Sequence, residues 1–276
     1  MNIILIGDPV AHSRSPAMQN AAFAHLGLDL TFAAVHTPLA DLPMRVAALR
    51  GSDYLGANVT LPHKQAVIPL LDTLEPEAER IGAVNVIYKG AGGELVGANT
   101  DAPGLLEDLR EAGMALAGGS AVLLGASGAA RAAAFSLASA GLSRLTIANR
   151  SLGRATDLVA NLRESATAQP EIQAVALDDP ALPTIIAAAD LLINATSLGW
   201  HADETPLPDP PVSARTLVYD MVYRETRLLR EASARGARTR DGAGMLVHQG
   251  ALALTRWTGR AAPIEIMWAA FRAAGT

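Results

Sequence analysis

The segment AVLLGASGAARAAAF, residues 121–135, constrains the fold of this chain more than any other stretch. An apolar run enters a glycine-rich turn and then an alanine-rich run, which is typical of a strand–turn–helix unit in a parallel α/β sheet. The spacing Gly125-x-Ser127-x-x-Ala130 matches the pattern G-x-G-x-x-A, with a serine at the second glycine. Backbone N–H groups at such a helix start can hold a pyrophosphate. The segment therefore predicts a dinucleotide site, in which we expect Gly128 to supply the backbone freedom that Ser127 lacks.

The end of the next strand, TIANRS, predicts which dinucleotide is bound. An NAD site usually places an Asp or Glu here for the ribose hydroxyls. This chain instead has Asn149 and Arg150, with Arg154 one helical turn later. Two guanidinium groups without a carboxylate suit the 2′-phosphate of NADP. The alternative is that both are ordinary surface arginines.

The same glycine-rich turn also resembles the nucleophile elbow of an α/β-hydrolase, with Ser127 as the nucleophile. Asp220 and His248 follow in the chain order that such a triad requires. Against this interpretation, Ala129 stands where the motif needs its second glycine, and no HGGG-type segment precedes the turn. The first hundred residues would also have no role.

Short strand-like runs alternate with longer helical runs along the whole chain, which predicts an α/β fold with mostly parallel strands. We expect a helix over 15–28 capped by Ser15, and a helix over 62–74 that starts at Pro62 and has Lys64 in its first turn. Residues 83–100 predict two strands around a glycine-rich turn, and the pattern restarts after Asp101. Two helices, over 244–259 and 263–275, are expected to close the chain.

Composition and charge exclude several classes of protein. With 276 residues, the chain is long enough for one large domain or two of ordinary size. The net charge of −5, without a long basic block, argues against a nucleic-acid-binding face. The absence of cysteine excludes disulfides and thiolate metal sites, and the six histidines show no metal-ligand spacing, so we expect no metal.

Neither a signal peptide nor a membrane span is expected. The start, MNIILIGDPVAHS, has no basic segment and only a short apolar run. The longest run of small apolar residues, 121–143, is interrupted by Arg131. We therefore expect a cytoplasmic protein.

Polar side chains gather where strands and turns of the first half end, and open α/β sheets bind ligands at such ends. They are Ser13, Ser15, Asn58, Thr60, Lys64, Asn85, Asn99, Thr100 and Asp101. Each has a simpler explanation, since Ser15 and Asp101 could cap helices and Asn85 and Asn99 could occupy turns. Together they offer uncharged donors, one lysine and one aspartate, which suits a small polyhydroxy acid.

The sequence resembles the shikimate/quinate dehydrogenase family from end to end. The matching segments, in order, are GDPVAHSRSPAMQN, GANVTLPHKQ, IGAVNV, GANTDAPG, GASGAAR, NRSLGR, INATSLG, YDMVY and DGAGMLVHQG. The resemblance implies NADPH-dependent reduction of 3-dehydroshikimate to shikimate, in the chorismate pathway to aromatic amino acids. It also implies a substrate domain of residues 1–101 plus 242–276, a Rossmann-type NADP domain of residues 102–241, and an active site in the cleft between them.

The resemblance also implies a role for each matching residue. Lys64 and Asp101 would be the catalytic pair. Lys64 would stabilise the negative charge on the oxygen of the carbonyl group that is reduced, and Asp101 would orient Lys64. The substrate carboxylate would be bound by Ser13, Ser15 and Tyr223, and its hydroxyls by Thr60, Asn85 and Gln249. The pyrophosphate would be held by Gly125, Ala126, Ser127, Gly128 and Ala129, the 2′-phosphate by Asn149, Arg150 and Arg154, and the nicotinamide by Met221 and Gly242. Tyr219 is expected to be structural.

Some positions depart from the pattern that is common in the family. They are Gln19, Val86, the NTDAPG segment and Ser127. None removes a catalytic group, but they leave open a quinate dehydrogenase, or an enzyme that acts on both acids. A ligand sensor without activity would be expected to lose Lys64 or Asp101, and both are present. The sequence leaves the protein a monomer or a homodimer.

Overall fold

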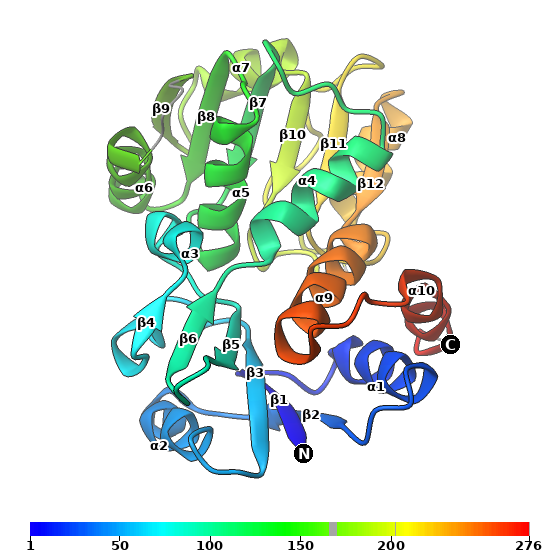
Figure 1. Cartoon of the computed structure of the whole chain (residues 1–276). Coiled ribbons are helices and arrows are strands. Elements are labelled where there is room, and N and C mark those ends of the chain that lie inside the picture. Colours follow the sequence, from blue (N-terminus) through cyan, green and yellow to red (C-terminus); the bar gives the residue numbers. More distant parts are fainter. Residues whose placement is uncertain (166–169, 202, 276) are drawn as a thin grey trace. The chain divides into compact units, whose positions relative to one another are not determined.

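The computed structural model describes residues 1–165, 170–201 and 203–275, and it divides the chain into two compact units. The first unit comprises Met1–Gly104 and Leu246–Thr276, and the second comprises Leu105–Met245. The boundary lies inside two helices, α4 (Asp101–Glu111) and α9 (Ala243–Thr258). Each unit contains one six-stranded sheet (Figure 1).

The sheet of the first unit is mixed. Its strands are β1 (Asn2–Gly7), β2 (Thr31–His36), β3 (Tyr54–Val59), β4 (Thr73–Leu74), β5 (Val86–Lys89) and β6 (Leu95–Ala98), in the order β2-β1-β3-β5-β6-β4. Strand β1 is parallel to β2 and β3, and β4 is parallel to β6, whereas β5 is antiparallel to both neighbours. The glycine-rich turn at 90–94 joins β5 to β6 as a hairpin, so the predicted pair of strands around this turn is confirmed.

The helices of the first unit lie around this sheet or pack on one another. They are α1 (Ser15–His25), α2 (Leu42–Ala48), α3 (Pro76–Ile81), the second half of α9, and α10 (Ile264–Ala273), with short 3₁₀ turns at Leu39–Asp41 and Ile68–Leu70. Trp257 of α9 donates its indole N–H to Ile87 O at 3.0 Å. Gln19 of α1 donates to Gly250 O of α9 at 2.9 Å. These buried contacts attach the end of the chain to the unit in which the chain begins.

The second unit is a doubly wound parallel sheet. Its strands are β7 (Ser120–Leu124), β8 (Arg144–Asn149), β9 (Glu171–Ala176), β10 (Leu191–Asn194), β11 (Leu217–Asp220) and β12 (Arg238–Asp241). Their order is β12-β11-β10-β7-β8-β9, and every pair is parallel. The strand order reverses between β10 and β7, and such a switch point is where doubly wound sheets bind ligands. The α/β class and the Rossmann-type unit predicted from the sequence are both confirmed.

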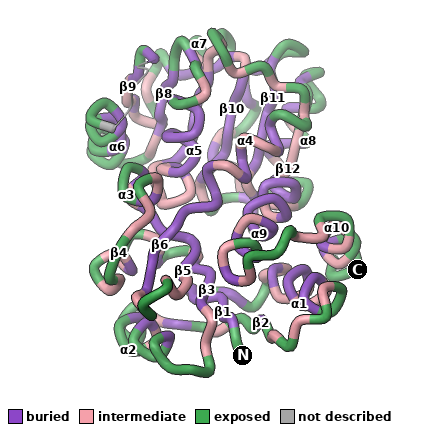
Figure 2. The backbone as a smooth tube through the Cα atoms, viewed as in Figure 1, coloured by how far each residue is buried: buried purple, intermediate pink, exposed green. Residues whose placement is uncertain are grey.

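Apolar strand faces hold the second unit together. Its helices are α5 (Gly128–Ser139), α6 (Leu152–Ser165), α7 (Leu182–Ala188) and α8 (Arg227–Ala234). The apolar faces of α7 and α8 pack with one face of the sheet, through residues such as Ile186 and Leu228 against Leu192 and Val218. Strands β7, β8, β10 and β11 are buried along most of their length, whereas β9 and β12 are less buried and α6 exposes its outer side (Figure 2).

Two local predictions are wrong. Residues 62–72 form turns and one 3₁₀ turn, and 73–74 form β4, in place of the predicted helix that starts at Pro62. Pro69 lacks a donor N–H, and the Lys64 carbonyl accepts from Val84 N at 2.8 Å, so no regular helical ladder forms. Ser15 is the first residue of α1 and does not cap it; the residue at the cap position, Arg14, makes no side-chain cap hydrogen bond.

No helix within the described residues is long and apolar enough to span a membrane.

Candidate active site

Lys64 lies in the turn that follows β3. Its backbone is fixed on both sides, since the His63 N–H donates to Thr60 O at 2.9 Å and the Lys64 carbonyl accepts from Val84. The neighbouring His63 ring is fully buried and contacts Thr37 O at 2.6 Å. Lys64 Nζ donates to Asp101 Oδ2 at 2.5 Å, and the two side chains are only 14% and 6% exposed. The chain therefore holds a shielded ion pair directly after a strand end.

Asp101 opens α4 but does not cap it. The side chain of Asn99 does so, because its Oδ1 accepts from the N–H groups of Asp101 and Ala102 at 3.0 and 3.2 Å. The simpler explanations, that Asn99 only occupies a turn and that Asp101 only caps the helix, are therefore both wrong. Since Asn99 satisfies the helix end, both carboxylate oxygens of Asp101 remain available to side chains.

Asn85 connects the ion pair to the rest of this cluster. Its Nδ2 donates to Asp101 Oδ1 and Thr100 Oγ1, each at 2.9 Å, and to Gln249 Oε1 at 3.3 Å. Its Oδ1 accepts from Thr100 N at 2.7 Å, which orients the amide. Asn58 Nδ2 donates to Asn85 O at 2.9 Å and so fixes the backbone. Three separated segments and α9 thus meet in one buried polar network.

The structure brings Lys64, Asn85, Asp101 and Gln249 into direct hydrogen-bonded contact. Thr60 O accepts from the N–H of His63, the residue before Lys64. Ser13 Oγ accepts from Ser15 N at 3.2 Å, and Ser15 is buried. Within the described residues, no hydrogen bond links either serine to the Lys64–Asp101 pair, so their part in the site rests on the resemblance.

In the second unit, the glycine-rich turn lies between β7 and α5. Gly125 has φ of +115°, and a Cβ there would lie 3.0 Å from Ala195 O, so glycine is required. Ser127 caps α5 by accepting from Ala130 N at 3.5 Å, and its hydroxyl donates to Ala195 O at 3.2 Å. The first N–H groups of α5 remain at the carboxyl end of the central strand, where a pyrophosphate would bind.

The hydrolase alternative finds no support in these contacts. The Ser127 hydroxyl donates a hydrogen bond to Ala195 O rather than to a histidine. Asp220 Oδ1 accepts from Asn194 Nδ2 and Val222 N, and Oδ2 accepts from Thr226 Oγ1. Burial raises the pKa of this carboxyl. Asp220 therefore organises the loops after β10 and β11.

Asn149 ends β8, and its Nδ2 donates to Ser151 O at 2.9 Å. Arg150 and Arg154 follow it, and both are exposed. Within the described part of the chain, neither guanidinium forms an ion pair. These two guanidinium groups, at the end of β8, could bind an anionic group of a ligand.

Met221, Tyr223 and Gly242 lie beyond β11 and β12. Met221 N donates to Asn194 O at 3.0 Å, and a Cβ on Gly242 would collide with the Met221 carbonyl, so the two backbones must lie in close contact. The ring of Tyr223 packs edge-on against Trp200, with 4.7 Å between centroids. Tyr219 is fully buried and donates to Asp108 Oδ2 at 2.6 Å, which confirms its structural role.

Two features escaped the sequence analysis. Nothing in the sequence around Trp200 indicates that its ring packs against Tyr223. Asp108 looks like one more acid on a helix, although its side chain is fully buried.

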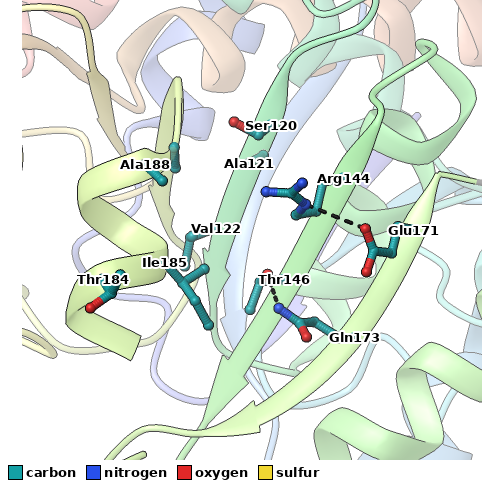
Figure 3. A pocket seen from close by; sticks show the side chains of 11 residues that line it. Ser120, Ala121, Val122, Arg144, Thr146, Glu171, Gln173, Thr184, Ile185 and Ala188 are labelled. Carbon is teal, nitrogen blue, oxygen red and sulfur yellow. Dashed lines mark hydrogen bonds and ion pairs between the residues drawn. The ribbon is translucent and has the colours of Figure 1, made fainter. Parts of the chain in front are cut away.

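A cavity of about 320 Å³ in the second unit contains none of the predicted site residues. It lies beside the starts of β7, β8 and β9, where Ser120, Arg144 and Glu171 are found, with Ile185 of α7 opposite (Figure 3). Doubly wound sheets bind ligands at the carboxyl ends of their strands, and this cavity is at the other end. Within the described residues, no group of three or more His, Asp or Glu side chains could hold a metal ion.

Comparisons with known proteins agree along the whole chain. Three family models match: the shikimate dehydrogenase substrate binding domain over residues 5–87, shikimate / quinate 5-dehydrogenase over residues 108–201, and the shikimate 5′-dehydrogenase C-terminal domain over residues 242–270. A protein of Moorella thermoacetica named shikimate dehydrogenase (NADP(+)) is 47% identical over 269 residues, which cover 96% of this chain and 90% of that protein.

Solved structures are similarly close. The shikimate 5-dehydrogenase of Thermus thermophilus, in complex with NADP(H) and shikimate, has a TM-score of 0.87 and 41% identity over 99% of both chains. A quinate dehydrogenase of Corynebacterium glutamicum, in complex with NAD, has a TM-score of 0.89 and 30% identity over 99% of both chains. From its family models, its relatives and its fold, this chain belongs to the shikimate dehydrogenase family.

Proposed function

We propose that this chain catalyses the reversible NADPH-dependent reduction of 3-dehydroshikimate to shikimate in aromatic amino acid biosynthesis. The observation that carries the proposal is the shielded Lys64–Asp101 pair, joined to Asn85 and Gln249. Relatives that span nearly the whole chain are named shikimate dehydrogenase (NADP(+)). We assign the protein to the cytoplasm, as a monomer or a homodimer, with a small-molecule substrate as its partner.

NADPH, when bound, supplies a hydride to the C3 carbonyl carbon of the substrate. The carbon–oxygen π bond opens, and negative charge grows on the oxygen. The Lys64 ammonium lies against this oxygen and stabilises the charge, and one proton, given by Lys64 or by water, completes the hydroxyl group. Such a positioned acid–base group typically contributes on the order of 10²–10⁴-fold in rate. Asp101 orients the Lys64 ammonium through their hydrogen bond and accepts a further hydrogen bond from a substrate hydroxyl.

The other polar residues of the first unit hold the substrate. Asn85, Gln249 and Thr60 offer hydrogen bonds to the ring hydroxyls. Ser13 and Ser15 offer hydroxyl donors to the carboxylate, with Tyr223 as a further donor. Because a site built to bind hydroxyls discriminates strongly against analogues that lack them, this set favours a polyhydroxy acid.

The residues of the second unit fit NADP. The turn from Gly125 through Ala126, Ser127 and Gly128 to Ala129 presents backbone N–H groups and has no side chain that would block a pyrophosphate at Gly125. Asn149, Arg150 and Arg154 offer an amide and two guanidinium groups to the 2′-phosphate. Met221 and Gly242 would line the nicotinamide pocket.

Quinate is the second candidate substrate. A quinate dehydrogenase in complex with NAD shares this fold at 30% identity. The experiment that separates the candidates measures NADPH or NADH formation by the purified protein, with shikimate or quinate offered against NADP⁺ or NAD⁺. Fast turnover with shikimate and NADP⁺ supports the proposal. A preference for quinate or NAD⁺ contradicts its specificity, and no turnover with any pair contradicts it entirely.

A further inference from the structure

Arg131 carries a positive charge to which the reaction described above gives no role. It is the only charged residue of α5. Its side chain is partly buried, and its Nε is fully buried without a hydrogen-bond partner. Within residues 1–165, 170–201 and 203–275, this guanidinium forms neither a hydrogen bond nor an ion pair. Because removing a charge from water is costly unless the charge is paired, the position of Arg131 suits a ligand that would pair with it.

The place of Arg131 in its helix makes this cost larger. The first turn of a helix carries a positive partial charge, which favours Asp or Glu and disfavours a cation. Neither α5 nor α6 has an acidic residue in its first turn. Arg131 is instead the fourth residue of α5, and Arg154 is the third residue of α6. Both helices therefore place an arginine where the backbone already attracts anions.

Arg131 lies on the side of α5 that faces α6. The two helices are neighbours, and both pack against β8. Burial lowers the pKa of Arg131, and the Asp157 carboxylate of α6 partly offsets this effect, so the guanidinium is within electrostatic reach of α6. Asp157 follows Arg154 by three positions, which places the two on the same side of α6. Arg131 and Arg154 thus belong to the same groove between the two helices.

The length of the Arg131 side chain leads it toward the carboxyl ends of the strands. In an α-helix, long side chains lean toward the N-terminus of the helix. The N-terminus of α5 follows the turn after β7, and α6 begins shortly after the end of β8. Asn149, Arg150 and Arg154 lie at this same end of β8. Three guanidinium groups are therefore gathered at one edge of the sheet, and in the described part of the chain none of them has an ion-pair partner.

We propose that Arg131 is a third guanidinium of the NADP site, which binds the adenosine 2′-phosphate together with Arg150 and Arg154 and so contributes to the choice of NADP over NAD. The proposal deepens the proposed function and rests on it, because that function supplies the dinucleotide. A phosphate monoester carries a charge of about −1.5 to −2 at pH 7 and has three strong acceptor oxygens, so it can accept from several guanidinium groups. The bound phosphate would supply the partner that Arg131 lacks within the chain.

Arg131→Met tests the proposal, because methionine keeps an apolar stem and removes the charge. The dissociation constants of NADP⁺ and NAD⁺ would be measured by titration calorimetry on the purified full chain, without substrate. For NADP⁺ we expect a rise of roughly tenfold to a hundredfold, since one charge-assisted hydrogen bond contributes that much, whereas for NAD⁺ we expect a value within about twofold of the wild type. Arg131→Lys, which keeps the charge without the planar fork, should recover part of the NADP⁺ affinity.

Arg163→Met is the matched control. Arg163 lies near the far end of α6 and donates to Ile172 O, so its loss removes one positive charge from the same unit but leaves the cofactor end of the sheet intact. Its NADP⁺ affinity should equal that of the wild type. An equal loss of NADP⁺ and NAD⁺ affinity in Arg131→Met would place Arg131 at a group that both dinucleotides share, and would overturn the proposal.

The alternative is that Arg131 only holds α5 against α6 through Asp157. In that case Asp157→Asn would weaken NADP⁺ binding as much as Arg131→Met does, and Arg131→Met would lower the free energy of unfolding of the ligand-free protein. The proposal predicts the opposite in both measurements. Asp157→Asn should leave NADP⁺ affinity unchanged or raise it, and ligand-free Arg131→Met should be at least as stable as the wild type in chemical denaturation, because an unpaired charge has been removed. A destabilised or unfolded Arg131→Met protein would therefore contradict the proposal.

The same titrations separate this proposal from the proposed function. If the wild-type chain binds NADP⁺ more tightly than NAD⁺, but Arg131→Met binds NADP⁺ as tightly as Arg163→Met does, this proposal alone is refuted. If the wild-type chain binds neither dinucleotide, or binds NAD⁺ more tightly, the cofactor of the proposed function is refuted as well.

Discussion

Lys64 Nζ lies 2.5 Å from Asp101 Oδ2 although the two residues are 37 positions apart, and both side chains are largely shielded from solvent. The pair exists because the turn after β3 is fixed to Val84 and because Asn99 frees Asp101 from capping α4. A buried charge needs a partner, and each group supplies it for the other. The arrangement holds a cation in place at the end of a strand.

Asp101→Asn should lower kcat with shikimate and NADP⁺ by on the order of 10²-fold or more, because the amide keeps the shape but leaves Lys64 without its counter-ion. KM for NADP⁺ should change little. Glu107→Gln is the matched control, since Glu107 lies on the same helix and pairs with Arg110 on the surface. Equal rates for Asp101→Asn and the control would remove Asp101 from the mechanism.

Arg150→Ala and Arg154→Ala should each raise KM for NADP⁺ by roughly tenfold to a hundredfold, since a hydrogen bond to a charged group contributes about 1.5–3 kcal/mol. KM for NAD⁺, which lacks the 2′-phosphate, should hardly move. Arg144→Ala, at the other end of the same strand and paired with Glu171, is the control. A similar rise in KM for NAD⁺ would show that these arginines do not bind the 2′-phosphate.

Ser127→Ala should raise KM for NADP⁺ a few-fold and lower the free energy of unfolding by about 0.5–2 kcal/mol, the usual cost of losing a helix cap. Turnover at saturating cofactor should persist. Ser136→Ala, within the same helix, controls for the loss of a serine hydroxyl. Abolished turnover in Ser127→Ala alone would instead agree with a nucleophilic serine.

The Arg50 guanidinium lowers the pKa of Asp72 from 3.8 to about 2, through contacts of 2.6 and 2.8 Å, and Leu95 N adds a further hydrogen bond. Because the folded pKa is the lower one, the charged carboxylate stabilises the fold above the unfolded pKa. This stabilisation is lost as the pH falls from about 4 to about 2.

Asp72→Asn should therefore lower stability at neutral pH and flatten its fall over that window, as measured by chemical denaturation at a series of pH values. Arg50→Gln should have a similar effect, since it removes the same pair. If the stability of both variants fell with pH as steeply as that of the wild type, this ion pair would not be the cause of the loss at low pH.

Local patterns were enough to predict much of the fold. The run from Ala121 to Phe135 is a strand, turn and helix as expected, because apolar periodicity and glycine placement act over neighbouring residues. Strand β12, with the sequence RTRD, was missed because an edge strand of polar residues has no apolar alternation.

The remaining features of the fold and the site depend on contacts between residues that are far apart in the sequence. The turn at 61–67 could not be predicted because the Lys64 carbonyl finds its partner in Val84, far along the chain. Lys64, Asn85 and Asp101 were all indicated by the sequence, but their hydrogen bonds depend on the mixed pairing of β3, β5 and β6. Nothing in the spacing around Asp108 indicates that its side chain is buried.

The most direct test of the account is the rate of NADPH formation from shikimate by Lys64→Ala. The chain contains two lysines, and Lys89, which donates to Gly51 O, supplies the matched control Lys89→Ala. At saturating shikimate and NADP⁺ we predict a loss on the order of 10²–10⁴-fold in Lys64→Ala, and a rate close to that of the wild type in Lys89→Ala. If Lys64→Ala retained turnover within a few-fold of the wild type, Lys64 would not stabilise the reacting oxygen, and the proposed mechanism would be contradicted.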